Sequence, residues 1–457
     1  MAGISLPLRR LLSSRSFLAQ SAGYAYAALS MAGPWLLTSA YMLALSRLGV
    51  PGLTIQDIQS FQAVVLYCYA GSMLLTGFFQ LVAARHLSDH LFRKNTLAVV
   101  PSYSTTATLS LLLHGLVAGA AIYLLKPPLP LAVAAFTLFG AVGLVSSGMI
   151  FLGVLRNFSM ILAAFVAGIA VALALSQALA PRFGLSGLIA AFAAGHGLIA
   201  AVFLSRLRAE FPARHPWDRG LVSTAARHPS LMVIGAAFAG GIWIDKIVFW
   251  TGPWGRSSEA GLRICPIYDN GFFLASFTVL PALVLLFIRL EGSFHDKYAQ
   301  FYAALRKGAD LQTIRRSRGE IADSFSTTLV RLAVIQGMVT LAAVIYAPFL
   351  IELFRLDWIS FYVFRAACLG AYLQMLALAV LLSAVHLALY RIALVIALVD
   401  FAAGLLGAWI TCRAGPELLG FGSAAAGATA LLVGYPWIRS VLAVLERHTF
   451  MRQIGNP

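Results

Sequence analysis

The feature that most restricts the fold of this chain is a series of apolar stretches, each long enough to cross a lipid bilayer as a helix. A helix needs about 20 apolar residues to span the hydrocarbon core of a membrane. Hydrophobic residues make up 60% of the chain and charged residues only 11%, whereas soluble domains carry about 25% charged residues. The sequence therefore predicts an all-α integral membrane protein.

Windows of this kind give twelve candidate transmembrane helices in the 457 residues. Their approximate bounds are 24–46, 61–84, 103–125, 129–151, 158–180, 184–204, 229–251, 268–290, 328–351, 359–383, 388–411 and 420–444. The connection over 205–228 is the longest in the middle of the chain and separates six spans from six. We therefore expect an N-terminal six-helix bundle over 1–204, a cytoplasmic linker over 205–228 and a C-terminal six-helix bundle over 229–457. Paired halves of this kind are a known transporter design.

The distribution of Lys and Arg predicts the orientation in the membrane. With the N-terminus inside, this arrangement puts 23 of the 33 basic residues in inner segments and 7 in outer ones. Cytoplasmic loops accumulate Lys and Arg, so both termini are predicted to be cytoplasmic. The net charge of +16 then reflects topology rather than nucleic-acid binding. The opening MAGISLPLRRLLSSRS lacks an apolar core before a cleavage site, so it is interpreted as a retained cytoplasmic segment.

Ionisable side chains within the predicted spans are candidates for a transport pathway, because they are costly in lipid. Asp245 and Lys246 lie in GGIWIDKIVFW, deep in a span. As neighbours they point to different helix faces, so we expect them not to pair well with one another. Two interpretations stay open. Asp245 lines a hydrophilic pathway and Lys246 meets another carboxylate or a substrate oxygen, or each forms a structural ion pair between helices.

A second set of polar residues lies in later spans. Asp269, at the outer end of 268–290, lines the outer mouth or caps that helix. Arg365 and Gln374 share the span 359–383, and an ion pair between Arg365 and Asp400 of the next span is one possible arrangement. The candidate transport-pathway residues are thus Asp245, Lys246, Asp269, Arg365, Gln374 and Asp400.

No pattern in the sequence predicts catalysis, a metal or a cofactor. His86 and His90 lie four residues apart, as do Glu291 and His295, which places each pair on one helix face. Neither pair has a third ligand nearby in sequence, so a solvated or partner-binding face is the preferred interpretation. The four cysteines form no C-x-x-C pair, and no Walker, G-x-S-x-G or H-E-x-x-H motif is present. We therefore expect a protein that is not an enzyme.

The segment 291–318 follows the span 268–290 and is rich in Lys, Arg and aromatic residues. Its aromatic residues recur at spacings of three and four, which predicts an amphipathic helix suited to a partner or a membrane surface. The candidate docking residues are Glu291, Tyr298, Phe301, Tyr302, Arg306 and Lys307. Contact with anionic lipids alone is the alternative, since polybasic segments next to a membrane bind them.

Five stretches together resemble one family over essentially the whole chain: MAGISLPLRRLL, YAYAALSMAGPWLLT, RHLSDHLFRKN, WIDKIVFW and YDNGFFLASFTVLPALVLLFIRLEGSFHDKYAQFYAAL. They are similar to the PelG family of Pel exopolysaccharide transporters, within the multidrug/oligosaccharidyl-lipid/polysaccharide flippase superfamily. The resemblance implies a MATE-like fold of two six-helix bundles in the bacterial inner membrane. It also implies a cargo rich in N-acetylgalactosamine and N-acetylglucosamine, which is moved to the periplasm for the biofilm matrix.

The partners that the resemblance implies are a cytosolic glycosyltransferase, which uses UDP-sugars, and two further inner-membrane proteins, one of them a cyclic-di-GMP receptor. It carries over no catalytic motif. The leading hypothesis is a transporter of the Pel polysaccharide. An ion-coupled exporter of small molecules and a flippase for lipid-linked oligosaccharides are alternatives. A scaffold that assembles the synthase without transporting anything is a third.

Overall fold

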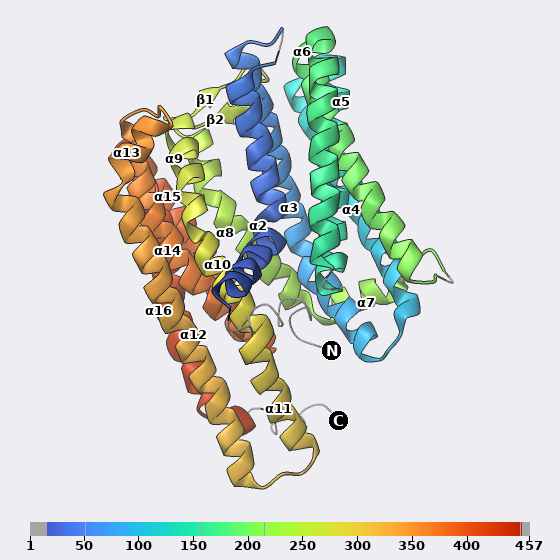
Figure 1. The fold of residues 1–457 in the computed structure, drawn as a ribbon, viewed down its shortest axis with the longest axis vertical. Coiled ribbons are helices and arrows are strands. Elements are labelled where there is room, and N and C mark those ends of the chain that lie inside the picture. Colours follow the sequence, from blue (N-terminus) through green and yellow to red (C-terminus); the bar gives the residue numbers. More distant parts are fainter. Residues whose placement is uncertain (1–15, 51, 156, 214, 448, 450–457) are drawn as a thin grey trace. The chain divides into compact units, whose positions relative to one another are not determined.

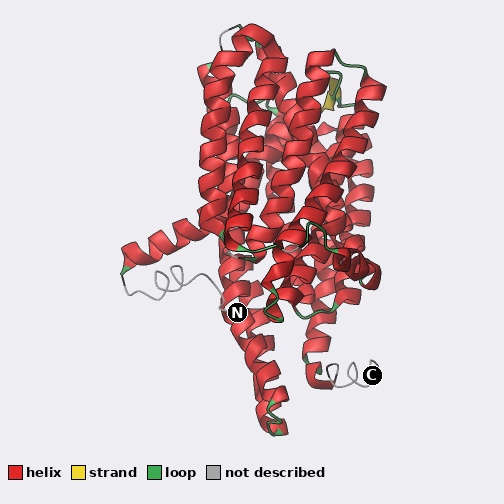
Figure 2. Cartoon of the chain, turned by 90° about the vertical axis from the view of Figure 1, so that its right-hand side faces the viewer, coloured by secondary structure: helices red, strands yellow, loops and turns green. Residues whose placement is uncertain are grey.

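The computed structural model describes residues 16–50, 52–155, 157–213, 215–447 and 449. These residues are almost entirely helical, as the sequence predicts (Figure 1, Figure 2). Within the described ranges, the only strands are β1 (Arg256–Ser257) and β2 (Arg263–Ile264), which form a short antiparallel ribbon.

Close contacts divide the chain into two compact units. Unit 1 comprises Met1–Ala28, Ile244–Trp254 and Pro266–Pro457, and unit 2 comprises Leu29–Trp243 and Gly255–Cys265. This division passes through helix α8 (Pro229–Thr251) rather than through the connection over 205–228. The two six-helix bundles with a boundary at 205–228 stay a prediction.

Unit 2 is a bundle of long helices around an apolar core. Its helices are α2 (Phe17–Leu48) from Leu29 onward, α3 (Ile55–Phe92), the short 3-10 helix η1 (Thr96–Ala98), α4 (Val99–Leu125), α5 (Leu129–Val154), α6 (Phe158–Glu210), α7 (Arg219–Arg227) and the first part of α8. Helix α3 begins with a capping box, in which Thr54 and Asp57 each accept a hydrogen bond from the other's backbone N–H. The rings of Tyr41, Phe61 and Phe192 pack against one another in the core.

Helix α6 folds back on itself. Its 53 residues would extend about 80 Å as a straight helix, far more than the bilayer needs. The helical path breaks at Gly184, which has φ 58° and ψ −141°. A Cβ placed on Gly195 would lie 2.4 Å from the carbonyl oxygen of Gly168, so the two halves of α6 pack side by side. The predicted spans 158–180 and 184–204 both lie in this element.

The number of spans differs from the prediction. Within the described ranges, ten helices are long and apolar enough to cross a membrane, or eleven if the broken α2 counts as one span. With α2 included, eleven spans compare with twelve predicted ones. The remaining difference lies in α6, which is counted once although each of its two halves is long enough to span a bilayer.

Unit 1 contains the rest of the helices. They are the first part of α2 up to Ala28, the end of α8, then α9 (Pro266–Ser276), η2 (Phe277–Val279), α10 (Leu280–Arg289), the π-helical turn η3 (Leu290–Phe294), α11 (His295–Arg306), α12 (Leu311–Ile345), α13 (Ala347–Leu353), α14 (Ile359–His386), α15 (Tyr390–Ala414), η4 (Pro416–Leu418) and α16 (Phe421–Leu442). The predicted span 268–290 is therefore interrupted by a 3-10 turn just before Pro281. A proline cannot donate the backbone hydrogen bond that a regular helix needs there.

Glycines bring three helices of unit 1 into backbone contact. A Cβ on Gly422 of α16 would lie 2.6 Å from the backbone of α15, and one on Gly427 would lie 2.7 Å from the backbone nitrogen of Gln374 in α14. Small residues permit this close approach, which is the usual way that helices associate within a membrane. The polar residues of α14, α15 and α16 are thereby held close together.

The fold-back of α6 can be tested with two glycines of the same helix half. Gly195→Ala places a methyl group against Gly168 and should cost about 1–3 kcal/mol of stability through overpacking. A Cβ on Gly197 meets nothing within 4 Å, so Gly197→Ala should be neutral or stabilise by up to about 1 kcal/mol. Thermal unfolding of both variants in detergent measures the difference, and equal melting temperatures would contradict the packing.

Candidate transport site

A buried ion pair lies in α8, in unit 1. Lys246 Nζ is 3.1 Å from Asp245 Oδ1, and both side chains are buried. The backbone N–H of Lys246 donates to the same oxygen at 2.7 Å. The expectation that these neighbours do not pair well was wrong. The flexible four-carbon stem of lysine lets its ammonium group fold back onto the carboxylate of the preceding residue.

Helix α9 completes the surroundings of this pair. The Tyr268 hydroxyl donates a hydrogen bond to Oδ2 of Asp245, so both carboxylate oxygens have donors. The ring centroid of Phe272 lies 3.5 Å from Lys246 Nζ, a cation–π contact that stabilises the ammonium group. The pair is therefore satisfied by groups within one unit, which a charge removed from water requires.

Asp269 also lies in this region but does not begin a helix. Its carboxylate accepts a hydrogen bond from the indole Nε1 of Trp250 at 3.0–3.1 Å. Helix α9 begins at Pro266, so Asp269 lies in the first turn rather than at the capping position. Asp269 is therefore not the N-cap of this helix. Its carboxylate instead links α9 to Trp250 of α8.

A second polar group joins α14, α15 and α16. The amide Nε2 of Gln374 donates to Asp400 Oδ1 at 2.9 Å and to the carbonyl oxygen of Ser423 at 3.2 Å. Asp400 is buried. A Cβ on Gly404, one turn after Asp400, would lie 3.4 Å from the side chain of Ile244, so α15 and α8 are in contact here. The two polar groups thus belong to one region of unit 1.

Arg365 does not join this region. Its side chain is exposed, with the guanidinium carbon 5.2 Å from the ring centroid of Phe361. Among the ion pairs of the described residues, none links Arg365 to Asp400. Nine residues separate Arg365 from Gln374, which places them about 180° apart around the helix axis. The Arg365–Asp400 pair is therefore not formed.

The predicted docking segment forms the hairpin of α11 and α12, which extends as an arm at the lower end of Figure 1. Tyr298 and Tyr302 are half-buried with ring centroids 4.6 Å apart, and Arg306 and Lys307 are exposed. Phe301 is fully buried, so its assignment to a partner-facing surface was wrong. It lies on the face of α11 that packs against other helices of the unit. The side chain of Glu291 lies outside the described residues.

Unit 2 contains buried polar residues that the sequence analysis did not single out. The Tyr69 hydroxyl is 2.7 Å from His196 Nε2 and 3.3 Å from the hydroxyl of Thr38. His114 Nε2 lies 3.0 Å from the hydroxyl of Ser72. Both histidines are buried in apolar spans, and a histidine inside such a span was the signal available in the sequence.

Solved structures with the same architecture are those of MATE transporters. "Crystal structure of MATE in the straight conformation" has a TM-score of 0.66 at 12% identity and covers 97% of this chain and 100% of that one. "Outward-facing conformation of a multidrug resistance MATE family transporter of the MOP superfamily" has a TM-score of 0.62 at 14% identity and covers 97% and 99%. The class of protein is thus an all-α, multi-pass membrane protein with the MATE fold.

The sequence also defines the family. The family model PelG, described as "Putative exopolysaccharide Exporter (EPS-E)", matches residues 1–450. The chain belongs to the PelG family, as its five characteristic stretches predict. No curated protein sequence matches this chain. Family and fold are those of transporters rather than of enzymes.

The ion pair in α8 predicts a strong dependence of stability on both partners. Lys246→Met leaves Asp245 as a buried charge without its ammonium partner and should cost about 3–5 kcal/mol. Adding Asp245→Asn should restore most of this loss, because an amide at position 245 is uncharged and still accepts from Tyr268. A double-mutant cycle of unfolding free energies measures the coupling. Additive effects of the two substitutions would contradict a buried pair.

Proposed function

We propose that the protein moves the Pel exopolysaccharide, an amino-sugar polymer, across the bacterial inner membrane to the periplasm. The observation that carries this proposal is the family match over residues 1–450 on a chain with the MATE transporter fold. The polymer would come from a cytosolic glycosyltransferase and contribute to the biofilm matrix. Twelve spans with both termini in the cytoplasm follow from the positive-inside distribution of the basic residues.

The polar region of unit 1 supports a carbohydrate cargo. Gln374 and the carboxylates of Asp245 and Asp269 supply hydrogen-bonding groups of the kind that bind sugar hydroxyls and N-acetyl groups. Tyr268 and Phe272 add aromatic surface beside these groups, with ring centroids 5.7 Å apart. Polar groups at membrane depth are expensive, which favours their use along a pathway.

The same region supports coupling to an ion gradient as a second function. Asp245 and Asp400 are buried carboxylates of the same region, which contains one buried ammonium group, that of Lys246. Carboxylates buried near one another repel, and binding a proton or a metal cation relieves that repulsion. We infer that an inward-directed cation gradient drives the export step through Asp400, which has an amide rather than a cation as its hydrogen-bond partner.

Translocation can be measured with the purified protein and its glycosyltransferase in liposomes. We expect radiolabelled polymer made from UDP-sugars on one side to become accessible to a hydrolase on the other, and an ion gradient to increase its rate. Asp400→Asn should abolish the gradient response, whereas Glu352→Gln, an exposed acid on α13, should retain it. No translocation despite polymer synthesis would support the scaffold instead. Transport of lipid-linked oligosaccharides without polymer transport would support a flippase, and transport of small molecules alone would support a small-molecule exporter.

We propose that the hairpin of α11 and α12 docks the glycosyltransferase on the cytoplasmic side. Arg306 and Lys307 lie exposed next to the tip of the hairpin, and Tyr298 and Tyr302 offer half-buried aromatic surface on the same helix. Arg318 of α12 already binds Glu446 at 2.8 Å and the carbonyl oxygen of Ala443, so it is engaged within the unit. The further inner-membrane partners, among them a cyclic-di-GMP receptor, would complete the assembly.

Charge reversal separates protein docking from lipid contact. Arg306→Glu with Lys307→Glu should abolish co-purification of the glycosyltransferase, because both residues are exposed and available to an acidic partner surface. The matched control reverses two exposed arginines in predicted outer segments, Arg182 and Arg256. The assay is repeated in nanodiscs of neutral lipids. Binding that persists in the first variant, or that needs anionic lipid in the wild type, would contradict docking through this hairpin.

A further inference from the structure

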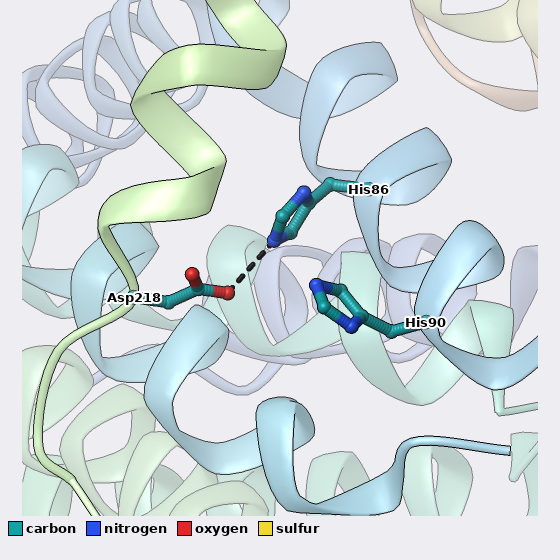
Figure 3. Close-up of side chains that lie close together, drawn as sticks. All are labelled: His86, His90 and Asp218. Carbon is teal, nitrogen blue, oxygen red and sulfur yellow. Dashed lines mark hydrogen bonds and ion pairs between the residues drawn. The ribbon is translucent and has the colours of Figure 1, made fainter. Parts of the chain in front are cut away.

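Three potential metal ligands meet in unit 2, although only two are close in sequence. His86 and His90 come from the last turns of α3, and Asp218 is the N-cap residue of α7, 132 positions after His86. One ligand atom from each side chain lies within 4.8 Å of the other two. Figure 3 shows both imidazole rings on the same side of α3, facing the carboxylate. The fold thus supplies the third ligand that the sequence pattern of His86 and His90 lacked.

Hydrogen bonds orient His86 toward this point. Its Nδ1 lies 2.9 Å from the hydroxyl oxygen of Thr224, and that hydroxyl donates to the carbonyl oxygen of Gly220 at 2.9 Å. A hydroxyl has one proton to donate, so the proton shared with His86 belongs to Nδ1. The lone pair of His86 then lies on Nε2, which faces Asp218. Metal-binding histidines are usually held in this way by a partner on the other ring nitrogen.

Asp218 is equally fixed. Its Oδ1 accepts from the backbone N–H of Gly220 at 2.8 Å, and its Oδ2 accepts from the Ser102 hydroxyl at 2.5 Å. The ring of His86, the hydroxyl of Ser102 and the backbone N–H of Gly220 thus fix the orientation of both carboxylate oxygens. An aspartate binds a metal as its carboxylate, and this one is held with Oδ2 toward the histidines.

In the tautomer with the proton on Nδ1, the contact between His86 and Asp218 has room for a positive centre. Nε2 lies 2.7 Å from Oδ2, and with the lone pair on Nε2 both atoms are acceptors. Either a second proton on the imidazole or a metal ion satisfies them. Tetrahedral zinc would separate the two atoms to about 3.3 Å, a small side-chain adjustment.

His90 distinguishes a metal site from a simple ion pair. A protonated His86 paired with Asp218 needs no third group, yet the His90 ring lies with its centroid 4.5 Å from that of His86. His90 Nδ1 lies 3.2 Å from the side-chain amide of Asn95, which leaves Nε2 to bind a metal. Binding through Nε2 needs the proton on Nδ1. The Asn95 amide, whose Nδ2 faces Nδ1 here, then flips so that its oxygen accepts from that ring nitrogen.

The start of α7 is shaped to this cluster. A Cβ on Gly220 would lie 2.9 Å from Asp218 Oδ1 and 3.2 Å from Cε1 of His86. A larger residue at this position would therefore push against both ligand side chains. The backbone N–H of Asp218 in turn donates to the hydroxyl of Thr105 in α4 at 2.9 Å.

From this geometry we propose that His86, His90 and Asp218 bind one divalent transition-metal ion of the zinc class, with water at the fourth position. Two imidazoles and one carboxylate favour such an ion over Mg²⁺ or Ca²⁺, which prefer oxygen ligands. The ion ties the first turn of α7 to the end of α3. It therefore fixes the connection that follows α6 to the body of unit 2.

The test uses full-length protein with a tag free of histidine, stripped with EDTA and titrated with ZnCl₂ in detergent. Wild type should bind one Zn²⁺ per chain, as elemental analysis measures, and its melting temperature should rise on binding. His90→Gln leaves the contact between His86 and Asp218 in place, so its metal-free melting temperature should match that of wild type. Its zinc affinity should fall at least tenfold, and the metal-dependent shift should disappear. His386→Gln, at the end of α14, is the matched control and should bind as wild type does.

Binding of Co²⁺ provides a second readout. Visible absorption bands of tetrahedral Co²⁺ should appear in wild type and be lost in His90→Gln. Three results would overturn the proposal. These are no stoichiometric zinc in wild type, unchanged affinity in His90→Gln, and an equal loss of affinity in His90→Gln and His386→Gln. Each of them would leave His86 and Asp218 as a hydrogen-bonded pair without a metal.

Discussion

A charge in the interior of a membrane protein must find its partners within the protein, because the hydrocarbon supplies none. In unit 1 this requirement is met at Asp245. One of its carboxylate oxygens receives the backbone N–H and the ammonium group of Lys246, and the other receives the hydroxyl of Tyr268. The ammonium group is stabilised in addition by the Phe272 ring. These contacts hold helices α8 and α9 together. The loss of any one donor leaves the charge on Asp245 with fewer partners in apolar surroundings.

The same requirement explains the glycines of α14, α15 and α16. The Gln374 amide reaches both Asp400 and the carbonyl oxygen of Ser423 only because the three helices approach within backbone distance. Gly427 and Gly422 make that approach possible. In lipid the close packing of small residues is itself a main source of helix association. The turns of these helices that pack closely are therefore the same turns that bring the buried polar groups within hydrogen-bond distance.

The helices of this protein could be predicted from sequence because membrane insertion depends on the length and apolarity of a segment, which are local properties. Which residues meet depends instead on the rotation and the breaks of each helix. Arg365 and Gln374 share α14 but lie on opposite faces, so only Gln374 reaches Asp400. Phe301 follows a π-helical turn, which changes the rotation of everything after it and turns this ring inward. Asp218 lies so far from His86 in sequence that no spacing rule relates them.

The buried ionisable residues of the two units differ in chemistry. Among the described residues, the buried carboxylates Asp245 and Asp400 both lie in unit 1, whereas the buried histidines, at positions 86, 114 and 196, all lie in unit 2. His114 and His196 bond to serine and tyrosine hydroxyls, which a neutral imidazole satisfies fully. A cation that enters the membrane interior gains most from a carboxylate. If export is coupled to a cation, its binding site therefore belongs to unit 1, and His114 and His196 give unit 2 polar groups that need no charge.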